Sequence, residues 1–319
     1  MAAMQIRSLD GDDEATVDLL LPGFRATMAA AAPADPPAPA ALLARLLQRR
    51  WGTERLVLAA FDGERPLGFA KLGTDVRTDP AVAHGSLWVF PAERRRGAGR
   101  ALLAAARDEL RGTGHETLLL DAPESAGAAA FGAALGGRRS GANLRHRLDL
   151  RAWTAPAVTG RRAGLRLVRW TDACPDDLVE SYARAWDRLD VAVNGQARPG
   201  GGGVRGVRLR EAEAARSGNR QAAVAAVRAG DGEVVGYSTL FVRNSPMADT
   251  GETLVLPERR RQGIGLLLKT ELIGWTAAEH PHLSALQAWN DERNAAVVAL
   301  NRRIGFTVDQ RWLTYRFDV

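Results

Sequence analysis

One signal appears twice in this chain of 319 residues, about half a chain apart. Residues 86–103 read SLWVFPAERRRGAGRALL, and residues 252–269 read ETLVLPERRRQGIGLLLK. Each copy passes from a short apolar strand through a proline and a run of arginines into Gly-x-Gly, and then into an apolar helix. This separation is too large for a solenoid repeat, so the sequence predicts two copies of one domain.

The repeated segment is suited to binding an anion. A strand that enters a helix through glycines leaves the first N–H groups of the helix without partners, and the helix dipole adds partial positive charge there. Glycine has no Cβ, so an anion can approach the backbone closely. The arginines at 94–96 and 260–261 add charge that suits a phosphate. A pyrophosphate is the group that this segment predicts.

Two other phosphate-binding turns and a plain helix cap are the alternatives. A dinucleotide-binding turn reads G-x-G-x-x-G, and neither copy has the third glycine in register. A P-loop reads G-x-x-x-x-G-K-[ST], which neither copy contains. A basic, solvated loop that only caps a helix would explain one copy. Two copies with the same order of strand, proline, arginines and glycines favour a binding site.

Both segments resemble the acetyl-CoA-binding motif of the GCN5-related N-acetyltransferases (GNAT), [Q/R]-x-x-G-x-[G/A]. The motif is filled by Arg94, Gly97 and Gly99 in the first copy and by Arg260, Gly263 and Gly265 in the second. The second half continues into SALQAWNDERNAAVVALNRRIGF, which is similar to the family's fifth strand, its asparagine-bearing loop and its helix ending in GF. The resemblance covers nearly the whole chain and is that of the tandem, two-domain acetyltransferases common in actinomycetes.

The resemblance implies acetyl-CoA as the cofactor, held by the strand end and loop of each copy. In the second half the expected contacts are Leu254, Val255, Arg260, Arg261, Gln262, Gly263, Ile264, Gly265, Leu266, Asn290 and Asn294. In the first half they are Val89, Arg94, Arg95, Arg96, Gly97, Ala98 and Gly99. Helix capping is the alternative role of the two asparagines.

The family fold implies an α/β class (α+β mixed sheet) for each half, in which helices flank a central mixed, mostly antiparallel sheet. We expect a degenerate N-terminal domain at 1–151 that retains a CoA site or completes the acceptor pocket. A linker is expected at 152–164 and a catalytic C-terminal domain at 165–319. Leu144–Leu150 is expected to close the first sheet and Leu313–Phe317 the second.

The two halves differ after the motif helix. Aligning residues 135–137 with residues 304–306 places Asp121 opposite Asn290 and Gly132 opposite Asn301. In the family, side-chain amides in this region reach the pantetheine arm and the phosphates, and a carboxylate would repel an anionic cofactor. The second half is therefore expected to keep the fuller cofactor site.

Acetyl transfer to an amine requires that the amine lose a proton, that the thioester oxyanion meet hydrogen-bond donors, and that the leaving thiolate gain a proton. Glu252 lies near the place where family members often have a general base, and a plain strand-edge acid is the alternative. The backbone N–H near Val255 is expected to polarise the thioester carbonyl. The family's general acid is often a tyrosine where this chain has Asn301, which leaves water, Tyr237 or Tyr315 as candidate proton donors.

The composition argues against several classes of binding partner. The chain is 46% hydrophobic and 25% charged, which is typical of a globular protein. Its net charge of +6 comes from arginines scattered among acids, with no basic tract interleaved with aromatics, so no nucleic acid is expected. The sequence has no signal-peptide pattern and no run of 18 apolar residues, so no membrane is expected and the location is expected to be cytoplasmic. Cys174 is the only cysteine and the histidines lack ligand spacing, so no metal is expected.

The sequence thus predicts an acetyl-CoA-dependent N-acetyltransferase that acts on a primary amine of a small molecule or short peptide, as a monomer or homodimer. The loop at 189–205, with its acids and glycines, is where acceptor specificity is expected, and a plain solvated loop is the alternative. One alternative is a mycothiol-synthase-like acetyltransferase. Another, from a different class, is a non-catalytic acyl-CoA-binding sensor or partner subunit.

Overall fold

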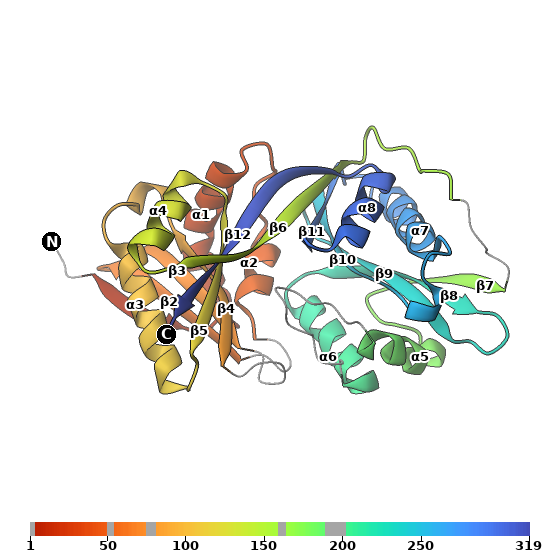
Figure 1. Cartoon of the computed structure of the whole chain (residues 1–319), viewed down its shortest axis with the longest axis horizontal. Coiled ribbons are helices and arrows are strands. Elements are labelled where there is room, and N and C mark those ends of the chain that lie inside the picture. The colour runs from red at the N-terminus through yellow and green to blue at the C-terminus, as the bar shows by residue number, and fades with distance from the viewer. Residues whose placement is uncertain (1–3, 50–53, 75–80, 159–163, 189–201) are drawn as a thin grey trace. The chain divides into compact units, whose positions relative to one another are not determined.

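The computed structural model describes residues 4–49, 54–74, 81–158, 164–188 and 202–319. The chain forms two compact units. The N-terminal unit consists of Met1–Asn143 together with Gln310–Val319, and the C-terminal unit consists of Leu144–Asp309. In each unit helices flank a mixed sheet, which confirms the expected fold class (Figure 1).

The two units repeat one order of elements. In the N-terminal unit they are β1 (Gln5–Leu9), α1 (Glu14–Ala31), α2 (Ala40–Leu47), β2 (Glu54–Asp62), β3 (Arg65–Thr74), β4 (Val82–Val89), η1 (Pro91–Glu93), α3 (Ala98–Gly112), β5 (Thr117–Pro123) and α4 (Ala126–Ala134). In the C-terminal unit they are β7 (Leu165–Thr171), α5 (Asp176–Asp187), α6 (Gly203–Arg216), β8 (Arg220–Arg228), β9 (Val234–Val242), β10 (Met247–Val255), η2 (Pro257–Arg259), α7 (Ile264–Glu279), β11 (Ala285–Asp291) and α8 (Ala295–Ile304). Two further strands, β6 (Arg138–Asp149) and β12 (Thr307–Asp318), pass from one unit into the other.

The last strand of each half completes the sheet of the other half. In the N-terminal unit the antiparallel strands β1 to β4 are followed by β5, which is parallel to β4, and then by β12, which runs antiparallel to β5 from Trp312–Pro123 to Asp318–Thr117. In the C-terminal unit β6 lies next to β11. The expectations that Leu144–Leu150 closes the first sheet and that Leu313–Phe317 closes the second are therefore both wrong. The limits 1–151 and 165–319 remain a prediction about the sequence repeats, whereas the compact units cross them.

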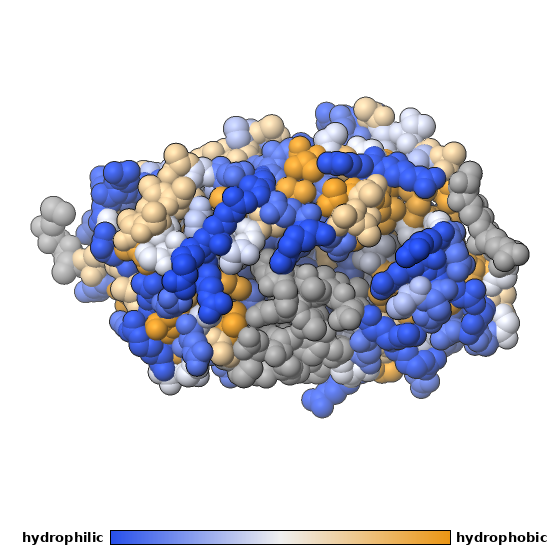
Figure 2. All heavy atoms as spheres, in the orientation of Figure 1, coloured by the Kyte–Doolittle hydropathy of each residue, from blue (hydrophilic) through white to orange (hydrophobic). Residues whose placement is uncertain are grey.

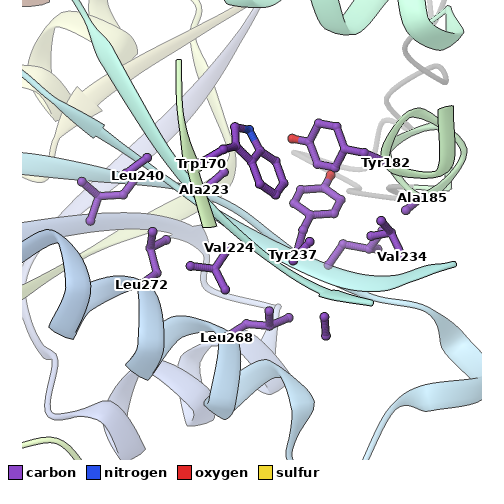
Figure 3. Packing of buried hydrophobic residues seen from close by; sticks show 14 of the residues in the cluster. Trp170, Tyr182, Ala185, Ala223, Val224, Val234, Tyr237, Leu240, Leu268 and Leu272 are labelled. Atoms are coloured by element: carbon purple, nitrogen blue, oxygen red, sulfur yellow. The ribbon is translucent and has the colours of Figure 1, made fainter. Parts of the chain in front are cut away.

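Helices cover both faces of each sheet. In the N-terminal unit α1 and α2 pack on a cluster around Phe69, and α3 packs on a separate cluster around Leu118. In the C-terminal unit α5 and α6 lie on one face of the sheet and α7 and α8 on the other (Figure 1). Figure 3 shows this division in the core, where Tyr182 and Tyr237 lie on the face opposite Leu268 of α7.

On the face shown in Figure 2, hydrophilic residues cover much of the described surface, and hydrophobic residues lie between them in smaller areas. Among the described residues, the large hydrophobic side chains that are clearly exposed are Leu19, Val204, Trp289 and Val308. Trp289 is 40% exposed and lies on β11, beside the residues that the sequence predicts to hold the cofactor.

Candidate active site

The loop between β10 and α7 leaves a helix N-terminus uncapped. After η2 the chain passes through two left-handed residues, Arg261 with a φ of 61° and Gly263 with a φ of 79°. Gly263 is the N-cap residue of α7, and no side chain in the described part of the chain caps this helix. The N–H groups of the first turn therefore lie at the positive end of the helix dipole without a side-chain acceptor, an arrangement that binds anions.

The first arginine of the motif closes the turn. The Nε of Arg260 donates to the carbonyl of Val255 at 3.1 Å, which ties the loop to the end of the strand. In the N-terminal unit the Nε of Arg94 donates to the carbonyl of Val89 at 3.3 Å. These bonds explain why an arginine stands first in both copies, and they leave the following arginines exposed for an anion.

The N-terminal unit repeats the loop geometry. Arg95 has a φ of 65°, and Gly97, the N-cap residue of α3, has a φ of 90°. Again no side chain among the described residues caps the helix. The structure thus has two loops of the same shape, one in each unit.

Strands β10 and β11 separate toward the loop. They pair in parallel only from Met247–Ala285 to Asp249–Gln287, although both continue beyond that point. Leu256 N–H donates to Val235 of β9. Because the N–H groups of an antiparallel strand alternate in direction, the N–H of Val255 points away from β9 and toward the opening between β10 and β11. It is a donor for a group that enters this opening.

A bulge in β10 takes Glu252 out of the regular pairing with β9. The register between β10 and β9 shifts between Thr250 and Thr253. The backbone N–H of Glu252 donates to Thr239 Oγ1 at 2.9 Å, in place of a ladder bond. A Cβ on Gly251 would lie 2.2 Å from Thr239 Oγ1, so only glycine fits there. In the N-terminal unit the described pairing of β3 with β4 continues without a shift through Ser86, the counterpart of Glu252.

The carboxylate of Glu252 is held by an arginine from α6. Arg210 Nη1 donates to Glu252 Oε2 at 2.9 Å, and its Nη2 lies 2.8 Å from Oε1. The Glu252 side chain is 10% exposed, and the guanidinium lies 5.1 Å from the ring centroid of Trp186. Burial lowers the pKa of Arg210, but the charge of Glu252 more than offsets this, so the pKa lies above its ordinary value. Glu252 is therefore a fixed carboxylate beside the opening.

Two tyrosines on the same face of the sheet belong to the core. Tyr182 and Tyr237 meet edge to face with ring centroids 4.9 Å apart, and Tyr237 is fully buried (Figure 3). Burial is the main cause that raises the pKa of Tyr182 above its ordinary value, so its phenol keeps its proton at any working pH. These contacts explain Tyr237 as a packing residue.

Two of the predicted asparagines are joined on the other face of the sheet. Asn301 is fully buried on α8, and its Nδ2 donates to Asn290 Oδ1 of β11 at 2.7 Å. The Oδ1 of Asn301 accepts from the Nζ of Lys269 of α7, also at 2.7 Å. Asn290 lies on the part of β11 that has separated from β10, so this chain of hydrogen bonds reaches the opening.

Asn294 is the N-cap residue of α8. Its Oδ1 accepts from the backbone N–H of Val297 at 3.2 Å. The capping role is therefore present, and a cofactor contact through its amide nitrogen remains a prediction.

The register corrects the alignment of the two halves. Asp121 lies on the face of its sheet opposite α3, where its Oδ1 accepts from Thr314 Oγ1 at 2.6 Å. Its neighbour Ala122 faces the α3 side and packs on that cluster. Asn290 faces α8, on the side of the sheet that α7 also covers. The structural counterpart of Asn290 is therefore Ala122, which faces the α3 side, and not Asp121. A shift of one residue along a strand moves a side chain to the other face.

Tyr315 belongs to the N-terminal unit. It lies on β12 and packs over Gly132 of α4, where a Cβ would come within 2.8 Å of its ring. These contacts explain Tyr315 as a packing residue of that unit, and its role as a proton donor stays a prediction. The predicted acceptor loop at 189–205 falls largely outside the described residues, which resume at 202.

Sequence reasoning missed three side chains. Arg210 pairs with the candidate base, Lys269 holds Asn301, and His146 of β6 is fully buried with no hydrogen-bond partner on either ring nitrogen in the structure. One signal was available for Lys269. It follows three leucines in a helix that is apolar all round, which indicates burial.

The residues of the C-terminal unit fit coenzyme A. The uncapped end of α7 suits a pyrophosphate, and the Val255 N–H suits a carbonyl in the opening. At Gly265 a Cβ would meet only Leu300 and Val255 at ordinary distances of 3.5 and 3.6 Å. The protein's own packing therefore does not require glycine there, whereas a phosphate lying against the backbone would.

Residues 4–49, 54–74, 81–158, 164–188 and 202–319 contain neither a metal site nor a membrane-spanning helix. No group of three or more His, Cys, Asp or Glu side chains in these ranges could hold a metal ion. Within the same ranges, no helix has both the length and the apolar character needed to cross a membrane.

Known proteins are similar to this chain. The profile of the acetyltransferase (GNAT) family matches residues 23–136 and 201–306. The mycothiol acetyltransferase of Thermomonospora curvata is 31% identical over 273 residues, which is 82% of this chain and 82% of the relative. The mycothiol acetyltransferase of Clavibacter michiganensis is 31% identical over 266 residues, which is 82% of this chain and 79% of the relative.

A solved structure matches nearly the whole chain. It is a tandem GNAT protein from the clavulanic acid biosynthesis pathway, with a TM-score of 0.82 and 27% sequence identity. The match covers 99% of this chain and 98% of that one.

Proposed function

The chain belongs to the GCN5-related N-acetyltransferase family, with one such domain in each half, and from this premise we propose that it transfers the acetyl group of acetyl-CoA to a primary amine of a small molecule or short peptide. We place the reaction in the C-terminal unit. The observation that carries this choice is a pair of polar features around the β10–β11 opening, neither of which occurs in the described residues of the N-terminal unit. These are the bulge with Glu252 on one face and the Asn290–Asn301 pair on the other.

The cofactor would be held by the loop and the strand end. The first-turn N–H groups of α7 and the guanidinium of Arg261 would bind the pyrophosphate. The N–H of Val255 would donate to the thioester carbonyl and stabilise negative charge there as the amine attacks. Acetyl-CoA supplies the activated acetyl group when bound.

The acceptor is expected on the face covered by α5 and α6. Glu252 lies there, and its carboxylate would take the amine proton directly or through a water. The ion pair with Arg210 holds this carboxylate in a fixed position beside the opening. Trp289, which is exposed on the neighbouring strand β11, would form one wall of the acceptor site.

Mycothiol acetylation is a second candidate, favoured by the two relatives that carry that name. Assays with the deacetylated form of mycothiol and with a panel of other amines separate the two activities. Transfer to the mycothiol precursor alone would establish the second candidate, and transfer to other amines alone would exclude it.

Calorimetry with acetyl-CoA tests the proposal. We compare the wild type with Gly263→Glu, which puts a charged side chain into the loop of the C-terminal unit, and with the matched Gly97→Glu in the other loop. The wild type should bind, and Gly263→Glu should lose both the C-terminal site and acetyl transfer. Gly97→Glu should keep transfer. Loss of transfer in Gly97→Glu alone would place the active site in the other unit.

Two outcomes would overturn the acetyltransferase proposal. The first is a wild type that does not bind acetyl-CoA. The second is binding without transfer across the amine panel, which would indicate an acyl-CoA sensor.

A further inference from the structure

Lys269 is a buried lysine in the C-terminal unit. It lies on α7, six residues after the N-cap glycine, and is 4% exposed. Its Nζ donates to Asn301 Oδ1 and lies 5.4 Å from the ring centroid of Phe306. Burial lowers the pKa of Lys269 to about 8. A charge in such a place costs stability, so its presence calls for a role.

The hydrogen bonds from Lys269 run in one direction. An ammonium group only donates, so Asn301 must present its oxygen to Lys269 and its NH2 group to Asn290. Asn290 in turn accepts with its oxygen, which leaves its own NH2 group as the outer end of the chain. The protonated lysine thus fixes an N–H donor at the edge of β11, where the strand has separated from β10.

The positive charge is not neutralised by nearby acids. Within the described residues Lys269 has no ion pair. Asp309 is paired with Arg145 and Asp291 with Arg293, while Glu271 of α7 itself is paired with Arg169. The charge of Lys269 therefore remains available to an anion that arrives at the outer end of the chain.

The remaining titratable neighbours do not supply a negative charge either. Arg302 is exposed on α8. Burial, together with the charges of Lys269 and Arg302, lowers the pKa of His146, so this ring is neutral at pH 7, where the lysine is charged.

The other half of the chain provides an internal comparison. Leu103 stands six residues after its N-cap glycine, where the C-terminal unit has Lys269. Gly132 corresponds to Asn301, since each lies seven residues after the cap of its helix, and Ala122 corresponds to Asn290. All three polar groups are replaced together by apolar residues or glycine. Lys269, Asn301 and Asn290 therefore form one hydrogen-bonded group, which is found in the unit with the bulged strand and not among the described residues of the other unit.

We propose that Lys269 is a positioning residue for the leaving group. Through its hydrogen bonds to Asn301 and Asn290, Lys269 directs its positive charge and the NH2 group of Asn290 toward the sulfur of coenzyme A. The inference rests on the proposed function. When the amine nitrogen bonds to the carbonyl carbon and the C–S bond breaks, the electron pair goes to sulfur. The amine proton leaves on the Glu252 side, and the thiolate takes a proton from water after release. The lysine chain stabilises this thiolate in place of a tyrosine that would protonate it.

The test measures the thiol of bound coenzyme A. Its ionisation is followed by the ultraviolet absorbance of the thiolate as the pH is raised, with the complex of desulfo-coenzyme A as the reference. Cys174 does not interfere, because burial raises the pKa of its thiol to about 12. All proteins in this test carry Gly97→Glu, which removes a site in the N-terminal unit from the measurement, and the protein with no further change is the unaltered chain of this test.

Two variants interrupt the hydrogen-bonded series Lys269–Asn301–Asn290 at different places. Lys269→Met removes the charge at similar length, and Asn301→Asp replaces the donor to Asn290 by an oxygen that pairs with the lysine. In the unaltered chain the bound thiol should ionise about one pH unit below free coenzyme A. Both variants should return it to the value of free coenzyme A while coenzyme A still binds. Lys71→Met, which changes the only other lysine, should leave the shift unchanged.

Two results would overturn the inference. A bound thiol that titrates like free coenzyme A in the unaltered chain, or one that stays shifted in Lys269→Met, would show that Lys269 does not act on the sulfur while the proposed function stands. Absence of coenzyme A binding in the unaltered chain would overturn the proposed function as well.

Discussion

Replacing Lys269 by methionine is expected to make the C-terminal unit more stable at neutral pH. The folded protein holds this ammonium group with a pKa of about 8, against an ordinary lysine value of 10.5. At about 1.4 kcal/mol per pH unit, the charged form costs the folded state roughly 3 kcal/mol. Methionine is unbranched and of similar length, so it fills the same space without a charge.

One contact is lost in this exchange. Asn301 Oδ1 no longer has its donor, which costs about 1–2 kcal/mol for a buried acceptor. The net gain at pH 7 is therefore about 1–2 kcal/mol in the free energy of unfolding.

The gain should depend on pH. Since the folded pKa lies below the unfolded one, the unfolded chain binds more protons between about pH 8 and 10.5, and wild-type stability rises there with pH. Lys269→Met lacks this rise. Its advantage should shrink above pH 8 and change sign between about pH 9 and 10, where the wild-type lysine is mostly neutral in the folded state.

Urea unfolding at pH 7 and at pH 9.5 measures both effects. Five of the eight tryptophans lie in the C-terminal unit, so their fluorescence reports its transition. A variant less stable than the wild type at pH 7 would refute the reasoning, because Lys269 would then be a net stabilising residue. A stability difference that does not change with pH would refute it as well.

Three further predictions concern other residues of the two units. Glu252→Gln should lower kcat about 100-fold and cost about 2 kcal/mol of stability, because Arg210 loses its counter-charge; unchanged kcat would exclude Glu252 as the base. Cys174, 2% exposed and with its pKa raised to about 12, should react with a thiol reagent at pH 8 only after unfolding, so fast labelling of the native protein would contradict its burial. Gly265→Ala should raise the melting temperature slightly yet weaken coenzyme A binding, whereas Gly99→Ala should lower the melting temperature; equal effects would remove the distinction between the two loops.

The loops and hairpins could be predicted from the sequence because their signals are local. Arginines before Gly-x-Gly fix the two motif loops, and Asp62-Gly63-Glu64-Arg65 fixes a hairpin through one left-handed glycine. The residues in these turns need no distant partner to adopt their conformation.

The strand exchange could not be predicted. The pattern of Leu313–Phe317 indicates a strand but not which strand it pairs with, and either half offers an open neighbour beside its fifth strand. The face on which Asp121 lies could not be predicted either. The alignment ran back along the sequence from the ends of α4 and α8, but the connection from β11 to α8 is one residue longer than the connection from β5 to α4. That extra residue decides on which side of the sheet the carboxylate lies.

The glycines of the two motif loops separate what folding requires from what a ligand requires. In the N-terminal unit a Cβ on Gly99 would lie 2.9 Å from the Phe131 ring, so packing alone demands glycine. In the C-terminal unit a Cβ on Gly265 would make only ordinary contacts, so the fold tolerates alanine there and another requirement keeps glycine. The same unit has the buried lysine, whose charge the fold also does not need. Both features cost stability in the C-terminal unit, and under the proposed function both would serve a bound anion and a leaving thiolate in the opening between β10 and β11.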